Sequence, residues 1–183
     1  QTDILTMGLP YICPYNVNSV MNPILVACLG LGYFFNMYRG KPLVRKDGVV
    51  IMTHPTPWAF HPVHHPSYID FFERVLSETT NPVEMSKKYE KAFAEDEWYR
   101  HLYRTSYAYH GVHPFYMWYW CAHALDHLSQ VIIVGGQPDA VRRMGFRPAT
   151  TFQDALEIAS DTVGLSPTIS HYHSPPIAMA DVT

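Results

Sequence analysis

The chain is poor in charged residues and has no strongly basic segment. Only 16% of its 183 residues are Asp, Glu, Lys or Arg, against roughly 25% in typical soluble domains. The net charge is −3 and no run of Lys and Arg exceeds two residues, which argues against a nucleic-acid partner. The hydrophobic share is 48%, enough for a chain of this length to bury one core. A disordered protein is therefore excluded, and we expect a single domain over residues 1–183.

The sequence also lacks the features of secreted and membrane-spanning proteins. Its three cysteines lie far apart without a CxxC motif, which is typical of a reduced, cytoplasmic protein. The opening Gln1-Thr2-Asp3 does not resemble a signal peptide. The longest apolar stretch, residues 24–35, is shorter than the roughly 20 residues that cross a bilayer. We expect no contact with a membrane and, because a strand begins almost at the first residue, a C-terminal domain of a longer polypeptide.

Apolar runs separated by helical patterns predict the fold class. Buried strands are expected at 3–7, 48–53 and 131–134, and a short last strand near 168–171. Such runs are typical of a parallel sheet that is covered on both faces. The expected fold is three-layer α/β, with a mostly parallel sheet and helices on both faces.

Helix signals lie between these strands. A helix is expected from Ser19 or Asn22 to about Tyr38, a second after a Ser67 cap, and a last one after the Thr151-x-x-Asp154 capping box. The charged stretch 82–96 and the aromatic stretch 98–128 also favour helices. Together they predict a helical, aromatic-rich insertion over residues 81–128.

Three loops are expected at one edge of the sheet, where ligands of parallel α/β folds bind. They follow the three long strands and cover residues 10–18, 54–66 and 135–138. The third loop contains Gly135-Gly136 but lacks the spacing of a dinucleotide-binding motif, and the chain contains neither GxSxG nor a P-loop. The topology therefore predicts the location of a site without defining its reaction.

The chain has 11 histidines, and four of them lie in the second loop, at positions 54, 61, 64 and 65. Prolines stiffen this loop, and imidazole is a common metal ligand. However, the spacing matches no known metal motif, so packing of these rings on neighbours is favoured and no metal site is predicted. His123 and His127 share one helix face, but a third ligand is missing from the pattern.

Two further groups are candidates for substrate contacts. Asn16 and Asn18 precede a helix, where they could orient an anionic ligand or act as turn formers and caps, and we weigh the two interpretations equally. The run 115–120 contains five aromatic residues close to His113. Packing in the core or between subunits is favoured for this run, with Trp118 and His113 as candidates for an aromatic pocket wall.

The order of these segments resembles the C-terminal domain of the nickel-pincer lactate racemase family. The resemblance rests on Asp3-Ile-Leu, the loop rich in Pro and Asn, Lys46-Asp47-Gly48-Val-Val-Ile-Met, Gln130-Val-Ile-Ile-Val and Thr151-Phe-Gln-Asp-Ala-Leu. It implies a larger N-terminal domain that binds a nickel-pincer nucleotide, and a C-terminal domain that closes the cleft.

The family's C-terminal domain contributes a Gln and a Lys three residues apart, and a Trp. The matching positions here carry Met21 and Ile24, which cannot hydrogen-bond a carboxylate, and Trp118 is the nearest match for the Trp. The resemblance therefore implies a racemase-like or epimerase-like isomerase acting on a hydroxylated small molecule that is held by other residues.

The sequence interpretation assigns roles to six residues. His54, His65 and Trp118 are the expected catalytic residues, and Asn16, Asn18 and His113 are expected to bind substrate. Two alternatives stay open. One is a non-catalytic assembly or ligand-binding domain, with a homodimer through the 115–120 surface, and the other is a self-contained histidine–metal hydrolase.

Overall fold

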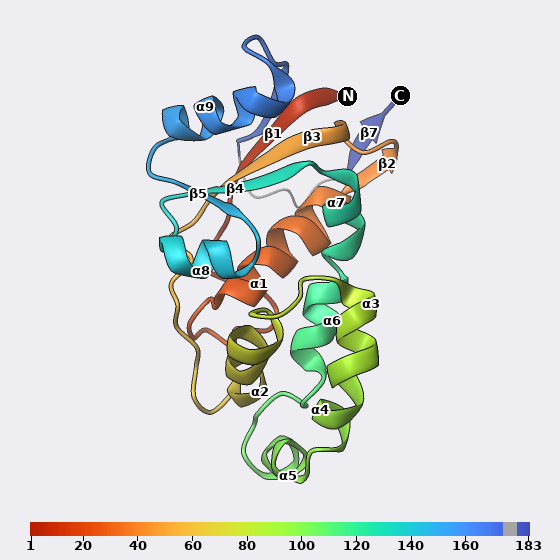
Figure 1. Cartoon of the computed structure of the whole chain (residues 1–183), viewed down its shortest axis with the longest axis vertical. Helices are drawn as coiled ribbons and strands as arrows, with labels where there is room; N and C mark the ends of the chain where they lie inside the picture. Colours follow the sequence, from red (N-terminus) through yellow and green to blue (C-terminus); the bar gives the residue numbers. More distant parts are fainter. Residues whose placement is uncertain (174–178) are drawn as a thin grey trace.

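The centre of the molecule is a five-stranded sheet in the order β5-β4-β3-β1-β6, in which all neighbouring strands are parallel (Figure 1). The computed structural model describes residues 1–173 and 179–183. The strands of this sheet are β1 (Thr2–Gly8), β3 (Val44–Thr53), β4 (Gln130–Val134), β5 (Arg147–Ala149) and β6 (Ile169–Tyr172). The four strands expected from the sequence are therefore confirmed.

Three short strands were not expected from the sequence. β5 forms one edge of the main sheet, and β2 (Tyr38–Gly40) pairs with β7 (Ala180–Val182) in a separate two-stranded sheet. Each of these strands has only three residues, too few to show a period of two in the sequence.

Helices cover both faces of the main sheet, which confirms the three-layer α/β fold (Figure 1). On one face, Ile4, Val49 and Ile132 pack against the small residues Ala155 and Ala159 of α9 (Phe152–Val163). The predicted capping box at Thr151 and Asp154 starts this helix. The opposite face, which includes Leu5, Met7, Val50, Met52 and Ile133, packs on the larger core formed with the other helices.

The helix after the first loop begins where the sequence predicts it. Asn22 caps α1 (Pro23–Ala27) by accepting a hydrogen bond from Leu25 N, and Pro23 lies in the first turn. The helix continues as the π-helix η1 (Cys28–Tyr33) and the 3₁₀ turn η2 (Phe34–Asn36). It ends two residues before the predicted Tyr38, because that residue starts β2.

The predicted Ser67 cap is wrong. Helix α2 (Pro66–Asp70) begins two residues earlier than a Ser67 cap implies, after His65, and continues as the π-helix η3 (Phe71–Val75). Proline has no N–H to leave unpaired, and its fixed φ suits the first turn of a helix. Ser67 therefore lies inside the helix, where its hydroxyl donates to the carbonyl oxygen of His110.

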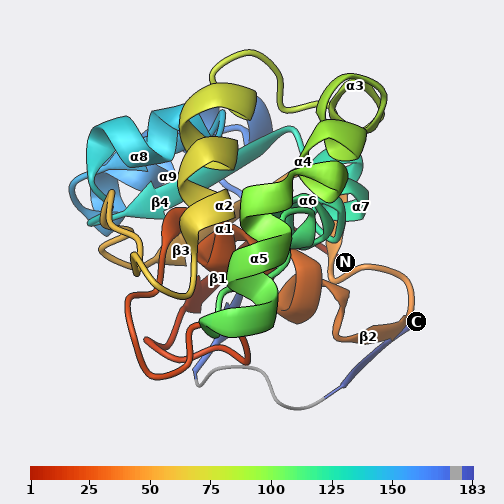
Figure 2. The same cartoon turned by 90° about the horizontal axis from the view of Figure 1, so that it is seen from below.

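The region 81–128 is helical, as expected. It contains α3 (Pro82–Met85), η4 (Ser86–Glu90), α4 (Lys91–Glu95), α5 (Glu97–Thr105), α6 (His113–Tyr119) and α7 (Ala122–His127). Figures 1 and 2 show α5 at the end of the molecule farthest from the sheet. Phe71, Phe93 and Phe115 pack ring against ring between these helices and η3. The region therefore shares one hydrophobic core with α1 and α2.

One more helix, α8 (Pro138–Arg143), follows the third loop and leads into β5. None of the helices in the described part of the chain is long and apolar enough to cross a membrane.

Candidate functional site

The three loops expected at one edge of the sheet meet there. They follow β1, β3 and β4, which are neighbours in the parallel sheet, so their carboxyl ends point the same way. Gln137 connects the third loop to the second, since its N–H donates to Pro55 O at 2.9 Å and its Oε1 accepts from Trp58 N at 2.7 Å. The site predicted from topology is therefore a physical cluster of loops.

His54 lies at the end of β3 and is only 2% exposed. Its Nδ1 accepts a hydrogen bond from Thr56 N at 2.9 Å, so the neutral ring carries its proton on Nε2. That Nε2 is buried and has no hydrogen-bond partner within the described residues. The Tyr11 ring, with its centroid 5.1 Å away, lies beside the imidazole. Burial lowers the pKa of His54 from 6.5 to about 4, so at neutral pH the ring is an uncharged donor.

His65 ends the second loop and is fully buried. Its Nε2–H donates to the carbonyl oxygen of Tyr15 at 2.9 Å, which leaves Nδ1 as the acceptor of the neutral ring. Among the described residues this Nδ1 has no partner, although it is buried. Burial lowers the pKa of His65 to about 4, and the hydrogen bond that the ring donates to the Tyr15 carbonyl only partly opposes this. The imidazole is therefore a neutral acceptor inside the loop cluster.

His113 joins His65 through a group of tyrosines. The rings of His65 and Tyr109 stack at 5.5 Å, Tyr109 and His113 stack at 4.3 Å, and Tyr15 meets His113 edge-on at 5.0 Å. His113 Nδ1 lies 2.5 Å from the hydroxyl of Tyr68. Burial raises the pKa of Tyr68 well above 10 and lowers the pKa of His113 to about 4. The phenol therefore donates and the neutral imidazole accepts.

Asn16 and Asn18 have different environments. The Asn16 amide is 1% exposed and binds the loop itself, donating to Tyr11 O and Ser19 O and accepting from Cys13 N. Asn18 is exposed and adopts a left-handed backbone conformation, with φ of 56°. Of the two amides, that of Asn18 is the one with free hydrogen-bonding groups on the surface.

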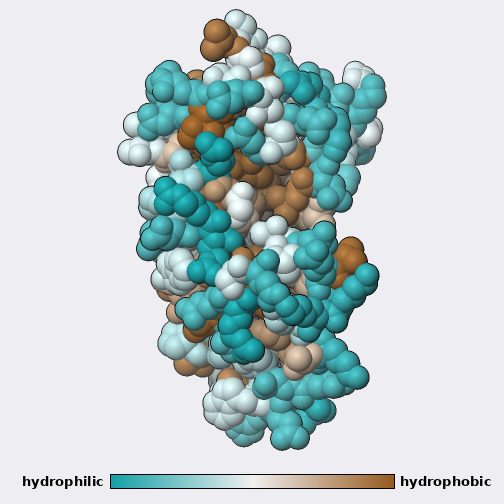
Figure 3. All heavy atoms as spheres, in the orientation of Figure 1, coloured by the Kyte–Doolittle hydropathy of each residue, from teal (hydrophilic) through white to brown (hydrophobic). Residues whose placement is uncertain are grey.

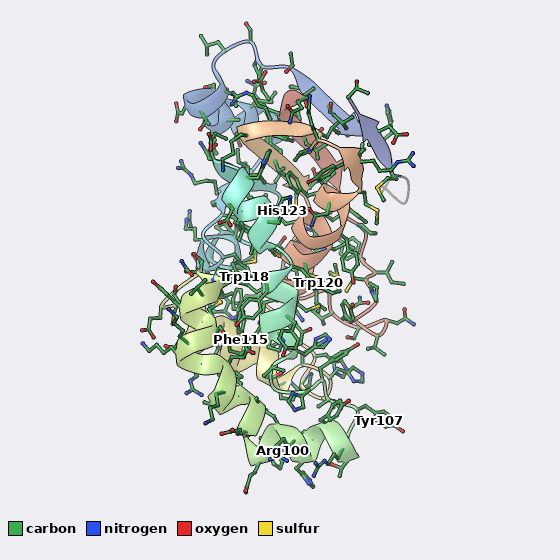
Figure 4. The ribbon with its side chains drawn as sticks, turned by 90° about the vertical axis from the view of Figure 1, so that its right-hand side faces the viewer. Arg100, Tyr107, Phe115, Trp118, Trp120 and His123 are labelled. Atoms are coloured by element: carbon green, nitrogen blue, oxygen red, sulfur yellow. The ribbon has the colours of Figure 1, made fainter. Side chains whose placement is uncertain are left out.

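Trp118 lies away from the three loops, in the core of the helical region (Figure 4). Its ring is fully buried and stacks on Phe146, and its Nε1–H donates to Thr80 O at 3.0 Å. Of the predicted aromatic run, Phe115 and Met117 are also buried, whereas Tyr116 and Trp120 are exposed. The exposed aromatic surface at 115–120 is therefore smaller than the sequence suggests.

The other loop histidines pack on each other and bind backbone groups. His61 and His64 stack at 4.2 Å, and His61 Nδ1 accepts from the N–H groups of Val63 and His64. Within residues 1–173 and 179–183, no three His, Cys, Asp or Glu side chains are grouped so as to hold a metal ion. His123 binds the Tyr38 hydroxyl and His127 binds Val44 O, so this pair connects the helix α7 to β2 and β3.

Two hollows open outside the group of predicted residues. One of about 570 Å³ lies beside the second loop and is lined by Trp58, Leu76, Ser77, Asp139, Arg142 and Arg143. The other, of about 470 Å³, opens between the end of α7 and the starts of β4 and β5. Figure 3, in the same orientation as Figure 1, shows hydrophobic residues at the surface near the middle of the molecule.

Sequence reasoning missed the tyrosines that complete the loop cluster. Tyr11, Tyr15 and Tyr109 contact the predicted histidines, yet they lie in loops without a recognisable motif. The excess of aromatic residues, 14% of the chain, was the one signal that pointed to them.

A solved structure with a similar fold is the lactate racemase apoprotein from Thermoanaerobacterium thermosaccharolyticum. The match has a TM-score of 0.60 and 16% sequence identity, and it covers 100% of this chain and 36% of the racemase chain. No family model matches the sequence, and no curated protein matches it either. The chain thus spans about a third of the racemase and has the fold of that part of it.

Proposed function

We propose that this chain is the C-terminal, substrate-closing domain of a cytoplasmic, lactate-racemase-like isomerase or epimerase. Its substrate would be a 2-hydroxy acid or a related hydroxylated small molecule. The reaction would invert a carbon that bears a hydroxyl group, after transient removal of its hydride or proton. The chain corresponds to 36% of the racemase, so we propose that a larger domain supplies the rest of the active site.

The observation that carries this proposal is the pair of buried ring nitrogens, without partners among the described residues, that the second loop presents at its two ends. His54 offers a donor and His65 an acceptor, and within the described residues neither nitrogen has a partner. Leaving a buried polar atom without a hydrogen bond costs about 1–3 kcal/mol of folding free energy. A hydroxyl or carbonyl oxygen of a bound ligand would accept from His54 Nε2–H and remove that cost. The His54 donor suits a carboxylate, carbonyl or hydroxyl oxygen, whereas the His65 acceptor suits the proton of a hydroxyl group.

The remaining predicted residues take roles that fit their surroundings. We assign Asn18 to orienting the substrate with its free amide, and His113 to the wall of the site with Tyr15 and Tyr109. Asn16 and Trp118 would act as positioning residues, because Asn16 holds the first loop and Trp118 holds α6, which carries His113.

Exposed apolar side chains support a closing role. Tyr11, Ile12 and Val17 of the first loop are 68%, 60% and 53% exposed, and Val63 of the second is 46% exposed. A group of apolar side chains on loops that meet at one edge is typical of a surface that contacts another domain.

The described residues of this chain do not fit the nickel-pincer nucleotide. The described residues contain no group of three metal-ligating side chains, and the free Nε2 of His54 carries a proton and cannot bind a metal. We therefore propose that the cofactor would be held mainly by the larger domain, and we derive no step through it.

The test uses the full-length protein from its native host. Each enantiomer of lactate and of related 2-hydroxy acids is incubated with the enzyme, and inversion is followed by chiral chromatography. We expect Asn18→Ala and His54→Ala to abolish inversion, whereas His101→Ala on the exposed surface of α5 keeps it. Elemental mass spectrometry of the same protein should find stoichiometric nickel. Unchanged inversion in both site variants would refute the assignment of the site.

The second candidate is a non-catalytic assembly or ligand-binding domain that has kept the fold. It is favoured by the exposure of Tyr116 and Trp120, which are 47% and 44% exposed near the end of α6. A homodimer could bury these rings. Light scattering after size-exclusion chromatography distinguishes the two, since a dimer that Trp120→Ala dissociates, in a protein without inversion activity, would favour assembly.

A further inference from the structure

A hollow of about 410 Å³ lies beside α5, in the helical region. It is lined by Ala94, Glu95, Arg100, Tyr103, Arg104 and His110. Figure 4 shows Arg100 at the far end of this region, away from Trp118 and His123. The hollow uses none of the residues that the proposed function requires.

The polar side chains of this hollow are mostly hydrogen-bond donors without partners. The guanidinium groups of Arg100 and Arg104 form no hydrogen bond or ion pair with any residue in the described parts of the chain, and the same holds for the Tyr103 hydroxyl. His110 accepts from Val112 N through Nδ1, so the neutral ring presents its Nε2–H as a donor. The hollow therefore combines two positive charges with two neutral donors.

Three of the six other arginines pair with carboxylates among the described residues. Arg39 binds Asp181 at 2.6 Å, Arg45 binds Asp3 at 2.6 Å and Arg142 binds Asp139 at 3.3 Å. Arg100 and Arg104 lie one helical turn apart on α5, a spacing at which like charges repel each other. An anion between the two guanidinium groups would remove this repulsion.

The hollow is also lined by one carboxylate, that of Glu95, which has a lysine nearby. Glu95 lies 3.9 Å from Lys91, one turn earlier on the same helix. The groups that face the hollow thus carry two positive charges against one partly neutralised negative charge. The rings of Tyr103 and His110, which meet edge-on at 5.4 Å, form an aromatic side to the hollow.

We propose that this hollow binds a small oxyanion, either a phosphate or a carboxylate group, between Arg100 and Arg104. Guanidinium forks match the paired oxygens of both groups. Tyr103 and His110 add donors at the side, and their rings provide contact area for an organic portion of the ligand.

Isothermal titration calorimetry of the full-length protein tests this site. The probes are inorganic phosphate, phenyl phosphate and succinate, each in a non-coordinating buffer at constant ionic strength. We expect saturable binding of a phosphate probe, of succinate or of both. Comparison of the three dissociation constants identifies which oxyanion the site prefers. R100Q/R104Q should weaken binding by about tenfold or more. Tyr103→Phe, which removes one hydroxyl from a half-exposed side chain, should cause a smaller loss.

The matched control is R142Q/R143Q, which removes the same charge from α8, another helix. Equal losses in the two double variants would overturn the proposal, because they would show a non-specific effect of net charge. Absence of saturable binding for all three probes would also overturn it. Since Arg100 and Arg104 are exposed, circular dichroism should show that R100Q/R104Q folds normally. Inversion activity is not needed for any of these measurements.

Discussion

The side chain of His65 and the backbone carbonyl of Tyr15 are 50 residues apart in the chain and are joined by a hydrogen bond of 2.9 Å. This bond connects the second loop at the edge of the sheet to the first. The same imidazole stacks on Tyr109, which extends the contact to the segment before α6. One buried side chain therefore holds three separate parts of the sequence together.

Replacing His65 should destabilise the whole domain. His65→Ala removes a fully buried ring and its bond to Tyr15, which we expect to cost about 2–4 kcal/mol. Urea unfolding followed by circular dichroism measures this loss. The control is His101→Ala, since His101 is exposed and should change stability by less than about 0.5 kcal/mol. Equal effects of the two substitutions would contradict the role given to His65.

Acid should destabilise the protein because three buried histidines must take up protons when it unfolds. Burial lowers the pKa of His54, His65 and His113 from 6.5 to about 4. Between pH 4 and pH 6.5 the unfolded chain binds more protons than the folded one. The contribution of these histidines to the free energy of unfolding is therefore fully present above pH 6.5, and it decreases as the pH falls towards 4. Each histidine adds a slope of up to about 1.4 kcal/mol per pH unit. Denaturant unfolding at a series of pH values should show this slope, and His113→Gln should reduce it.

Tyr11 should control access to His54. The ring of Tyr11 is itself 68% exposed, yet it lies 5.1 Å from the imidazole, which is 2% exposed. Tyr11→Ala should increase the rate of deuterium exchange at the ring C2–H of His54 several-fold, as measured by peptide mass spectrometry, with little change in stability. The control is Tyr107→Ala, which removes a ring that is 89% exposed. If His54 exchanges in both variants as it does in the parent protein, Tyr11 does not shield it.

Local sequence patterns predicted the layers of the fold and the position of the loop cluster. The apolar runs that became β1, β3 and β4 are buried on both faces, so hydrophobicity alone identifies them. The Thr151 capping box depends on neighbours three residues away, and the structure has it as predicted. The short strand β5, with Pro148 at its centre, depends on pairing with β4 and has no such local signal.

The details of the site depend on contacts between distant residues, which one sequence does not reveal. Asn16 is a polar residue in a loop at the edge of the sheet, where a ligand-binding residue is expected. Its amide, however, is hydrogen-bonded to backbone groups of Tyr11, Cys13 and Ser19. Trp118 belongs to an aromatic run that could be a surface or a core, and only the position of Phe146 decides for the core. Thr56 N–H donates a hydrogen bond to Nδ1 of His54, so the ring proton lies on Nε2. This Nε2 has no partner among the described residues.

The attachment of β6 to the sheet should depend on Asp3. Its carboxylate accepts from Thr168 N at 2.8 Å, from Thr168 Oγ1 at 2.7 Å and from Arg45 at 2.6 Å. These bonds, those from Thr168 first, hold the pKa of Asp3 well below its usual 3.8. Stability from this group is therefore present above pH 3.8 and is lost as the pH falls further, below the range in which the histidines act.

Asp3→Asn tests this attachment at neutral pH. The amide keeps one acceptor oxygen but loses the charge and one acceptor, so we expect faster hydrogen exchange in β6 and unchanged exchange in β4, which lies two strands from β1. Hydrogen exchange with mass spectrometry resolves the two strands. Asp161→Asn, at an exposed position of α9, makes the same change of charge without touching β6. Faster exchange of β6 in both variants, or in neither, would show that Asp3 does not hold this edge of the sheet.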